Sequence, residues 1–168
     1  IEDGLPDMAL AFEPKENDLM KQKPQKLDVP LLNKEMRNII FIVGLITDLI
    51  LLSIFFFLLQ QNYELDYLRT IIFAMLAIDS ISYVFCCKSL RKNIWQINFF
   101  NNKFLLGAWL FGVLALIAAI YFPPLNLFLK TTPLHLDSWK IIIGMAVINI
   151  VLIEFVKWIF IRNGKTQE

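Results

Sequence analysis

Four long apolar segments constrain the fold of this chain more than any other feature of its sequence. They cover residues 38–59, 70–87, 104–122 and 141–161. A helix needs about 20 consecutive apolar residues to cross a hydrocarbon core of about 30 Å, and each segment is close to that length. A buried helix of a soluble protein can resemble any one of them, but four in series are hard to explain in that way. The sequence therefore predicts an all-α integral membrane bundle with four transmembrane helices.

Composition supports a membrane protein and excludes several other classes. Hydrophobic residues make up 57% of the 168 residues and the mean hydropathy is +0.59, whereas soluble domains are usually about 45–50% apolar. The net charge of +1 argues against electrostatic binding to nucleic acid. The sequence has no phosphate-binding glycine loop, no nucleophile with a partner base and no zinc-ligand spacing, and the adjacent Cys86 and Cys87 match no metal pattern. We therefore expect no hydrolytic chemistry in this chain.

The first dozen residues join three carboxylates to an apolar run that is typical of half a membrane helix. A carboxylate such as Asp3 or Glu2 costs about 2.5 kcal/mol or more in hydrocarbon, so it is tolerated where it pairs, faces a cavity or holds a cation. Pro6 removes an amide donor and releases carbonyl groups upstream of it. Carboxylate and carbonyl oxygens are the ligands that calcium and magnesium prefer. The alternative is a polar loop before an interfacial helix.

Lysine and arginine residues predict the orientation of the chain. A polar segment, residues 13–37, carries three prolines and follows the opening run. If this segment is cytoplasmic, 13 of the 16 basic residues lie on its side of the membrane, as the positive-inside rule requires. We therefore expect residues 1–12 to be the end of one membrane helix, residues 13–37 a cytoplasmic loop, and residues 38–168 a four-helix transmembrane domain with a cytoplasmic C-terminus.

Two carboxylates are predicted to lie near the middle of the membrane. Asp3 is about ten residues from the cytoplasmic end of its helix, or about 15 Å at 1.5 Å per residue. This is the depth at which transporters place coupling-ion sites on discontinuous helices. Asp79 lies about as deep in its own span, where it either shares a cation with Asp3 or is a hydrogen-bonded packing residue. Asp48 is also deep, and a polar group on a neighbouring helix explains it equally well.

The remaining charged pair within a span has a simpler interpretation. Glu154 and Lys157 are three residues apart near the cytoplasmic end of the last segment. This spacing predicts an ion pair on one helix face, with the lysine stem reaching toward the membrane surface. His135 is alone in a loop, and we interpret it as structural.

Short motifs occur in series along the whole chain. The first is the run Glu2-Asp3-Gly4-Leu5-Pro6, followed by Ala9-Leu10. The later motifs are Glu13-Pro14, Pro30-Leu31-Leu32, Cys87-Lys88-Ser89, Leu105-Leu106-Gly107, Pro123-Pro124-Leu125, Thr131-Thr132-Pro133-Leu134 and Glu154-Phe155-Val156-Lys157. In this order the motifs resemble the C-terminal region of P-type cation-transporting ATPases of the calcium-pump kind, in which the sixth membrane helix usually reads T-D-G-L-P-A-x-A-L.

The resemblance implies the end of the sixth helix and helices seven to ten of a ten-helix pump, so that Ile1 lies inside a transport helix. It implies that Asp3 coordinates the transported cation, with calcium the expected ion. Glu2 replaces the family's threonine, and Ser80, with Asp79 just before it, takes the register of an eighth-helix ligand. ATP and Mg²⁺ would bind only through domains outside this chain, which should be inactive alone.

The expected partners are the lipid bilayer and the N-terminal part of the pump. The alternative function is a stand-alone four-helix membrane module for interaction or assembly, without enzymatic activity.

Overall fold

The computed structural model describes residues 4–13, 34–61, 63–88 and 99–164. Glu2, Asp3 and most of the predicted cytoplasmic loop lie outside the described residues. Within these ranges the chain is helical, and the predicted fold class is confirmed. The long helices are α2 (Lys34–Gln60), α3 (Leu65–Cys87), α4 (Lys103–Tyr121) and α6 (Leu136–Gly164). Each is long and apolar enough to cross a membrane.

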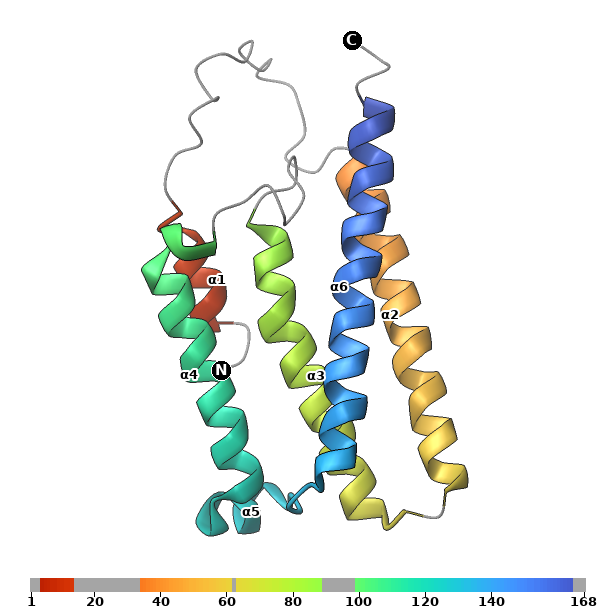
Figure 1. The fold of residues 1–168 in the computed structure, drawn as a ribbon, viewed down its shortest axis with the longest axis vertical. Helices are drawn as coiled ribbons and strands as arrows, with labels where there is room; N and C mark the ends of the chain where they lie inside the picture. The colour runs from red at the N-terminus through yellow and green to blue at the C-terminus, as the bar shows by residue number, and fades with distance from the viewer. Residues whose placement is uncertain (1–3, 14–33, 62, 89–98, 165–168) are drawn as a thin grey trace.

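The four long helices stand side by side, and a short helix, α1 (Gly4–Leu10), lies beside them (Figure 1). α3 has the central position, because it contacts α2, α4 and α6 as well as α1. The end of α1, the start of α4 and the end of α3 lie at one end of the bundle, where α2 also begins and α6 ends (Figure 1). This common end is the one that the charge pattern predicts to be cytoplasmic.

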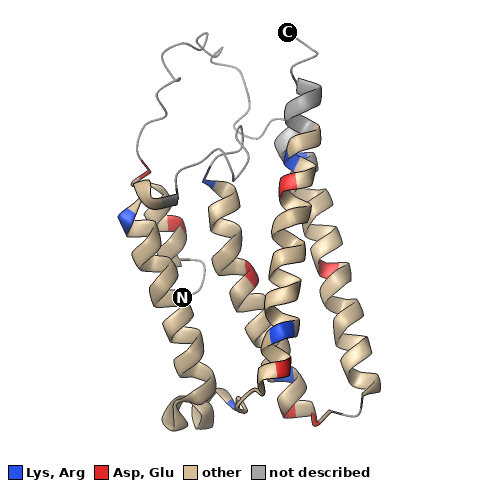
Figure 2. Cartoon of the chain, viewed as in Figure 1, with Lys and Arg blue, Asp and Glu red and all other residues tan. Residues whose placement is uncertain are grey.

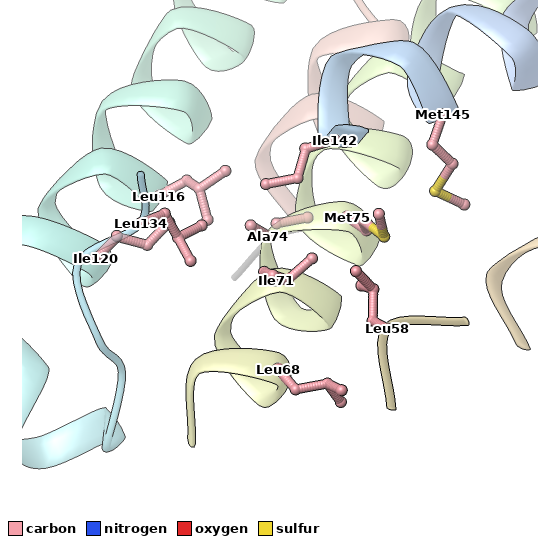
Figure 3. Close-up of a cluster of buried hydrophobic side chains, with 11 residues drawn as sticks. Leu58, Leu68, Ile71, Ala74, Met75, Leu116, Ile120, Leu134, Ile142 and Met145 are labelled. Atoms are coloured by element: carbon pink, nitrogen blue, oxygen red, sulfur yellow. The ribbon is translucent and has the colours of Figure 1, made fainter. Parts of the chain in front are cut away.

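The largest apolar core lies in the other half of the bundle, where α3 contacts all three of its long neighbours (Figure 3). Small and long side chains alternate on α3, so that Ala74 lets the neighbouring helices approach while Ile71 and Met75 fill the space between them. Leu58 of α2 and Ile142 of α6 are also fully buried in this core. Within a membrane, close packing rather than removal from water stabilises this core, because lipid tails are as apolar as these side chains.

The connection between α4 and α6 is structured, although the sequence gives it only as the stretch between the predicted apolar segments 104–122 and 141–161. It contains a short helix, α5 (Pro123–Leu129), with proline at its first position, where the missing amide hydrogen costs nothing. Lys130 ends α5 with a φ of 54°. The Tyr121 hydroxyl donates to the Leu134 carbonyl at 2.8 Å, and α6 begins two residues later. These contacts hold the connection against the ends of α4 and α6.

The contact between α3 and α4 depends on the absence of a side chain at Gly112. A Cβ atom built there would lie 3.0 Å from Ile81 Cδ1 and 3.2 Å from Ile81 Cγ1, whereas one at Gly107 would meet nothing within 4 Å. We expect Gly112→Leu to destabilise the chain by about 1–3 kcal/mol through overpacking. Thermal unfolding in detergent measures this effect, with Gly107→Leu on the same helix as the control. Equal melting temperatures for the two variants would contradict the prediction.

Candidate cation site and the polar contacts around it

α1, which directly follows the predicted transport residues in the sequence, begins part-way along the bundle (Figure 1). α1 has seven residues and is about 10 Å long, whereas α4 has 19 residues and is about 28 Å long. The first residue of α1 therefore lies well inside the length of α4, and the helix runs from there to the common end (Figure 1). Pro6 stands in the first turn of α1 and is buried, where a missing amide hydrogen is tolerated. Asp3 and Glu2 precede this turn.

A pocket of about 180 Å³ lies beside the start of α1. Leu5 and Pro6 line it together with Phe73 of α3 and Gly112 of α4. All of its described lining residues are apolar. The pocket therefore provides room next to α1, and its described side chains supply no oxygen ligand for a cation.

Polar side chains hold the opposite end of α1. The Asn102 side-chain amide donates to the Ala9 carbonyl at 2.9 Å and to Glu13 Oε2 at 3.1 Å. The ammonium group of Lys88 lies 3.2 Å from Glu13 Oε1. Asn102 also begins α4, because its side-chain oxygen accepts the Leu105 amide hydrogen at 2.9 Å. The end of α1 is thus joined to both α3 and α4.

Asp79 lies in a second, polar cavity on another side of α3. The cavity has a volume of about 280 Å³ and is enclosed by residues of α2, α3 and α6. The Asn149 amide donates to the Asp79 carboxylate, and the Thr47 hydroxyl donates to Asn149 Oδ1 at 2.7 Å. Asp48 lines the same cavity. Figure 2 marks acidic residues part-way along α2 and α3 in red. This hydrogen-bonded chain joins three helices and had no signal in the sequence beyond the polarity of its members.

Asp79 and the residues of α1 line different pockets. Leu5 and Pro6 share their pocket with Phe73, whereas Asp79 lines a cavity together with residues of α2 and α6. Ser80 follows Phe73 by seven residues, which is about two helical turns, so these two residues lie on the same face of α3. The face of α3 that shares a pocket with Leu5 and Pro6 therefore carries Ser80, and Asp79 lies about 100° around the helix from it.

Glu154 and Lys157 form the predicted ion pair, at 2.8 Å. Both side chains are only 1% exposed, and the Lys157 ammonium also donates to the Cys86 carbonyl at 3.1 Å. The prediction that the lysine stem reaches the membrane surface is therefore wrong: the ammonium group turns into the bundle and binds the last turn of α3. A backbone carbonyl near the end of a helix has no intrahelical partner, which explains why this position attracts a buried cation.

In the part of the chain that the structure describes, no three histidine, cysteine, aspartate or glutamate side chains gather closely enough to hold a metal ion. Cys86 and Cys87 are free thiols, and Cys86 is buried among apolar residues of α2 and α6. Both cysteines lie in the last turn of α3. The His135 ring lies against Tyr67 with centroids 5.8 Å apart.

These features define a multi-pass membrane protein: four membrane-length helices with α3 in the centre, and carboxylates and amides between them. The family described as "Cation transporting ATPase, C-terminus" matches residues 1–159. The chain therefore belongs to that family.

Curated relatives agree with this assignment. The calcium-transporting ATPase of Bacillus subtilis (strain 168) is 32% identical over 149 residues, which cover 88% of this chain and 17% of the relative. Calcium-transporting ATPase 1 of Bacillus cereus is 28% identical, over 94% of this chain and 19% of the relative. The calcium-transporting ATPase type 2C member 2 of Rattus norvegicus is 29% identical, over 94% and 17%. The chain thus spans less than a fifth of the length of these relatives.

Proposed function

We propose that this chain is the C-terminal membrane part of an ATP-driven calcium pump. The observation that carries the proposal is the family match over residues 1–159. The fold supports it, because a short helix followed by four membrane-length helices is the arrangement that the resemblance implies. Relatives of both bacterial and mammalian origin carry the name calcium-transporting ATPase, which favours calcium as the transported ion.

In this proposal Asp3 supplies a carboxylate ligand to the cation near the middle of the membrane. The position of α1 supports it, since the first described residue, Gly4, lies well inside the length of α4 (Figure 1). A carboxylate there would be costly unless it held a cation or a proton. Glu2 is a second proposed ligand. The remaining oxygen ligands come from helices outside this chain, because calcium takes six to eight of them.

Asp79 is the weaker of the proposed ligands. Its hydrogen bond with Asn149 and its place among α2 and α6 favour the alternative, a packing role in the bundle. Ser80, on the face of α3 that shares a pocket with α1, is the better placed of the two for a site that includes Asp3.

The energy for transport would come from an aspartyl phosphate formed in another part of the pump, where ATP and Mg²⁺ bind. The membrane helices would then alternate between two arrangements that open the site to one side or the other. Helices α2 to α6 would brace the transport helix, with the common end in the cytoplasm. That sidedness is supported by the 13 to 3 distribution of basic residues.

The gene sequence upstream of Ile1 tests the proposal. We expect an open reading frame that encodes D-K-T-G, which carries the phosphorylated aspartate, and later G-D-G-x-N-D. A start codon immediately before Ile1 would contradict the proposal and favour the stand-alone membrane module.

A further inference from the structure

Three side chains from separate parts of the chain meet at the end of α1 that lies farthest from Asp3. The group consists of Glu13, Lys88 and Asn102, and we refer to it as the α1 clamp. Lys88 follows the last residue of α3, and Asn102 precedes the first residue of α4. The Glu13 carboxylate accepts from both, with Oε1 3.2 Å from the lysine ammonium and Oε2 3.1 Å from the asparagine amide.

Two members of the clamp are buried and Glu13 is partly buried, which makes these contacts stronger than those of a fully exposed ion pair. The side chain of Lys88 is 3% exposed and that of Glu13 25% exposed, and Asn102 is 2% exposed. A buried charge must be paired and hydrogen-bonded to be tolerated. The Glu13 carboxylate therefore depends on Lys88 and Asn102 together, and losing either removes one of its hydrogen-bond donors.

The clamp also fixes the backbone of α1. The Ala9 carbonyl accepts from the Phe12 amide at 3.2 Å and from the Asn102 side chain at 2.9 Å. The Lys88 cation lies near the C-terminal end of α1, where a positive charge is favourable. Apolar contacts of Ala9 with Val84 and Leu105 close the same end of the helix. Sliding α1 by one residue, about 1.5 Å, would break all of these contacts together.

We propose that Glu13, Lys88 and Asn102 are positioning residues for the cation site at the start of α1. A helix of seven residues is short enough to move as a rigid rod, so fixing its end fixes the depth and rotation of its first turn, which Asp3 directly precedes in the sequence. This inference rests on the proposed function, because it concerns the same site. It assigns a transport role to residues that do not themselves touch the cation.

The variant Asn102→Asp distinguishes the role of Asn102 in the clamp from its role as the N-cap of α4. Aspartate keeps the acceptor that begins α4 but removes the amide donor and places a second carboxylate against Glu13. The neighbouring and exposed Asn101 gives the matched control, Asn101→Asp. For the cation, Lys88→Met is compared with Lys103→Met, an exposed lysine at the same end of the bundle.

The first readout is phosphorylation of the intact pump by ATP as a function of calcium concentration. We expect Asn102→Asp and Lys88→Met to raise the half-saturating calcium concentration by about 10-fold or more, which corresponds to losing one buried charge-assisted hydrogen bond. Phosphorylation by inorganic phosphate without calcium should be retained, which shows that the variants fold. The two controls should match the wild type.

The second readout is amide hydrogen exchange of the intact pump, which does not depend on transport. We expect the clamp variants to speed exchange in residues 8–12 by about 10-fold or more and to leave α6 unchanged. If the clamp variants exchange α1 amides at the wild-type rate, the proposed positioning role is wrong. It is also wrong if the wild-type pump responds to calcium and the clamp variants have the same calcium dependence. If the wild type is not phosphorylated in response to calcium, the proposed function fails, and hydrogen exchange still decides whether the clamp exists.

Discussion

Asp3→Asn in the intact pump is expected to abolish calcium-dependent phosphorylation by ATP. Asparagine keeps the size of the side chain but removes its negative charge, and the affinity of a calcium site depends on the number of charged oxygen ligands. Loss of an outer-shell partner already lowers metal affinity about 10–100-fold, so loss of a ligand should do at least as much. The measurement is the amount of phosphorylated protein across a range of calcium concentrations.

Asp66→Asn is the control for this experiment. Asp66 lies in the first turn of α3, at the end of the bundle away from the clamp. Its carboxylate pairs with Arg69 at 3.6 Å on the surface, where the two side chains are 64% and 60% exposed. Exposed pairs of this kind contribute little, so Asp66→Asn should behave as the wild type does. Normal calcium-dependent phosphorylation in Asp3→Asn would show that Asp3 is not a ligand.

Lys157→Met is expected to cause the largest loss of stability in the chain. It removes the ammonium group that lies 2.8 Å from the Glu154 carboxylate, which is 1% exposed, and with it the donor to the Cys86 carbonyl. Removing one partner of a buried ion pair costs about 3–5 kcal/mol. For a protein of this size the melting temperature should fall by about 6–20 °C, as measured by thermal unfolding in detergent.

The same helix contains a matched control. Asp137 and Lys140 have the same spacing and a similar separation of 2.7 Å, but their side chains are 87% and 77% exposed. Lys140→Met should therefore leave the melting temperature close to that of the wild type. The double variant Glu154→Leu with Lys157→Met should recover most of the loss, since no unpaired charge remains. A double variant less stable than Lys157→Met would contradict this explanation.

The four spans could be predicted from the sequence because membrane thickness sets the length of an apolar helix. The residues at which these helices begin and end could not be predicted. α3 begins at Leu65 and α6 at Leu136, each about five residues before the predicted apolar segment, because both first turns mix charged and apolar residues at the membrane surface. α5 was missed because Pro123-Pro124 ends one helix and begins the next, and a sequence motif alone does not separate these two effects.

Fewer of the polar contacts than of the helices could be predicted from the sequence. The pairing of Glu154 with Lys157 could be predicted, because a spacing of three residues places both on one helix face. The contact of Asn102 with Glu13 could not, since these residues are 89 positions apart. For Asp79, helical periodicity gives the angle of the side chain around α3 but not which neighbour lies there. Only the structure shows that its cavity is formed with α2 and α6.

ATP-driven calcium uptake is the most direct test of the function proposed for this chain. The full-length protein is placed in sealed membrane vesicles with its nucleotide-binding side outward, and uptake of radioactive calcium is followed with and without ATP. We expect ATP-dependent accumulation that a calcium ionophore releases and that Asp3→Asn eliminates. Vesicles that hold folded full-length protein but accumulate no calcium with ATP, or that accumulate it equally well with Asp3→Asn, would contradict the proposal.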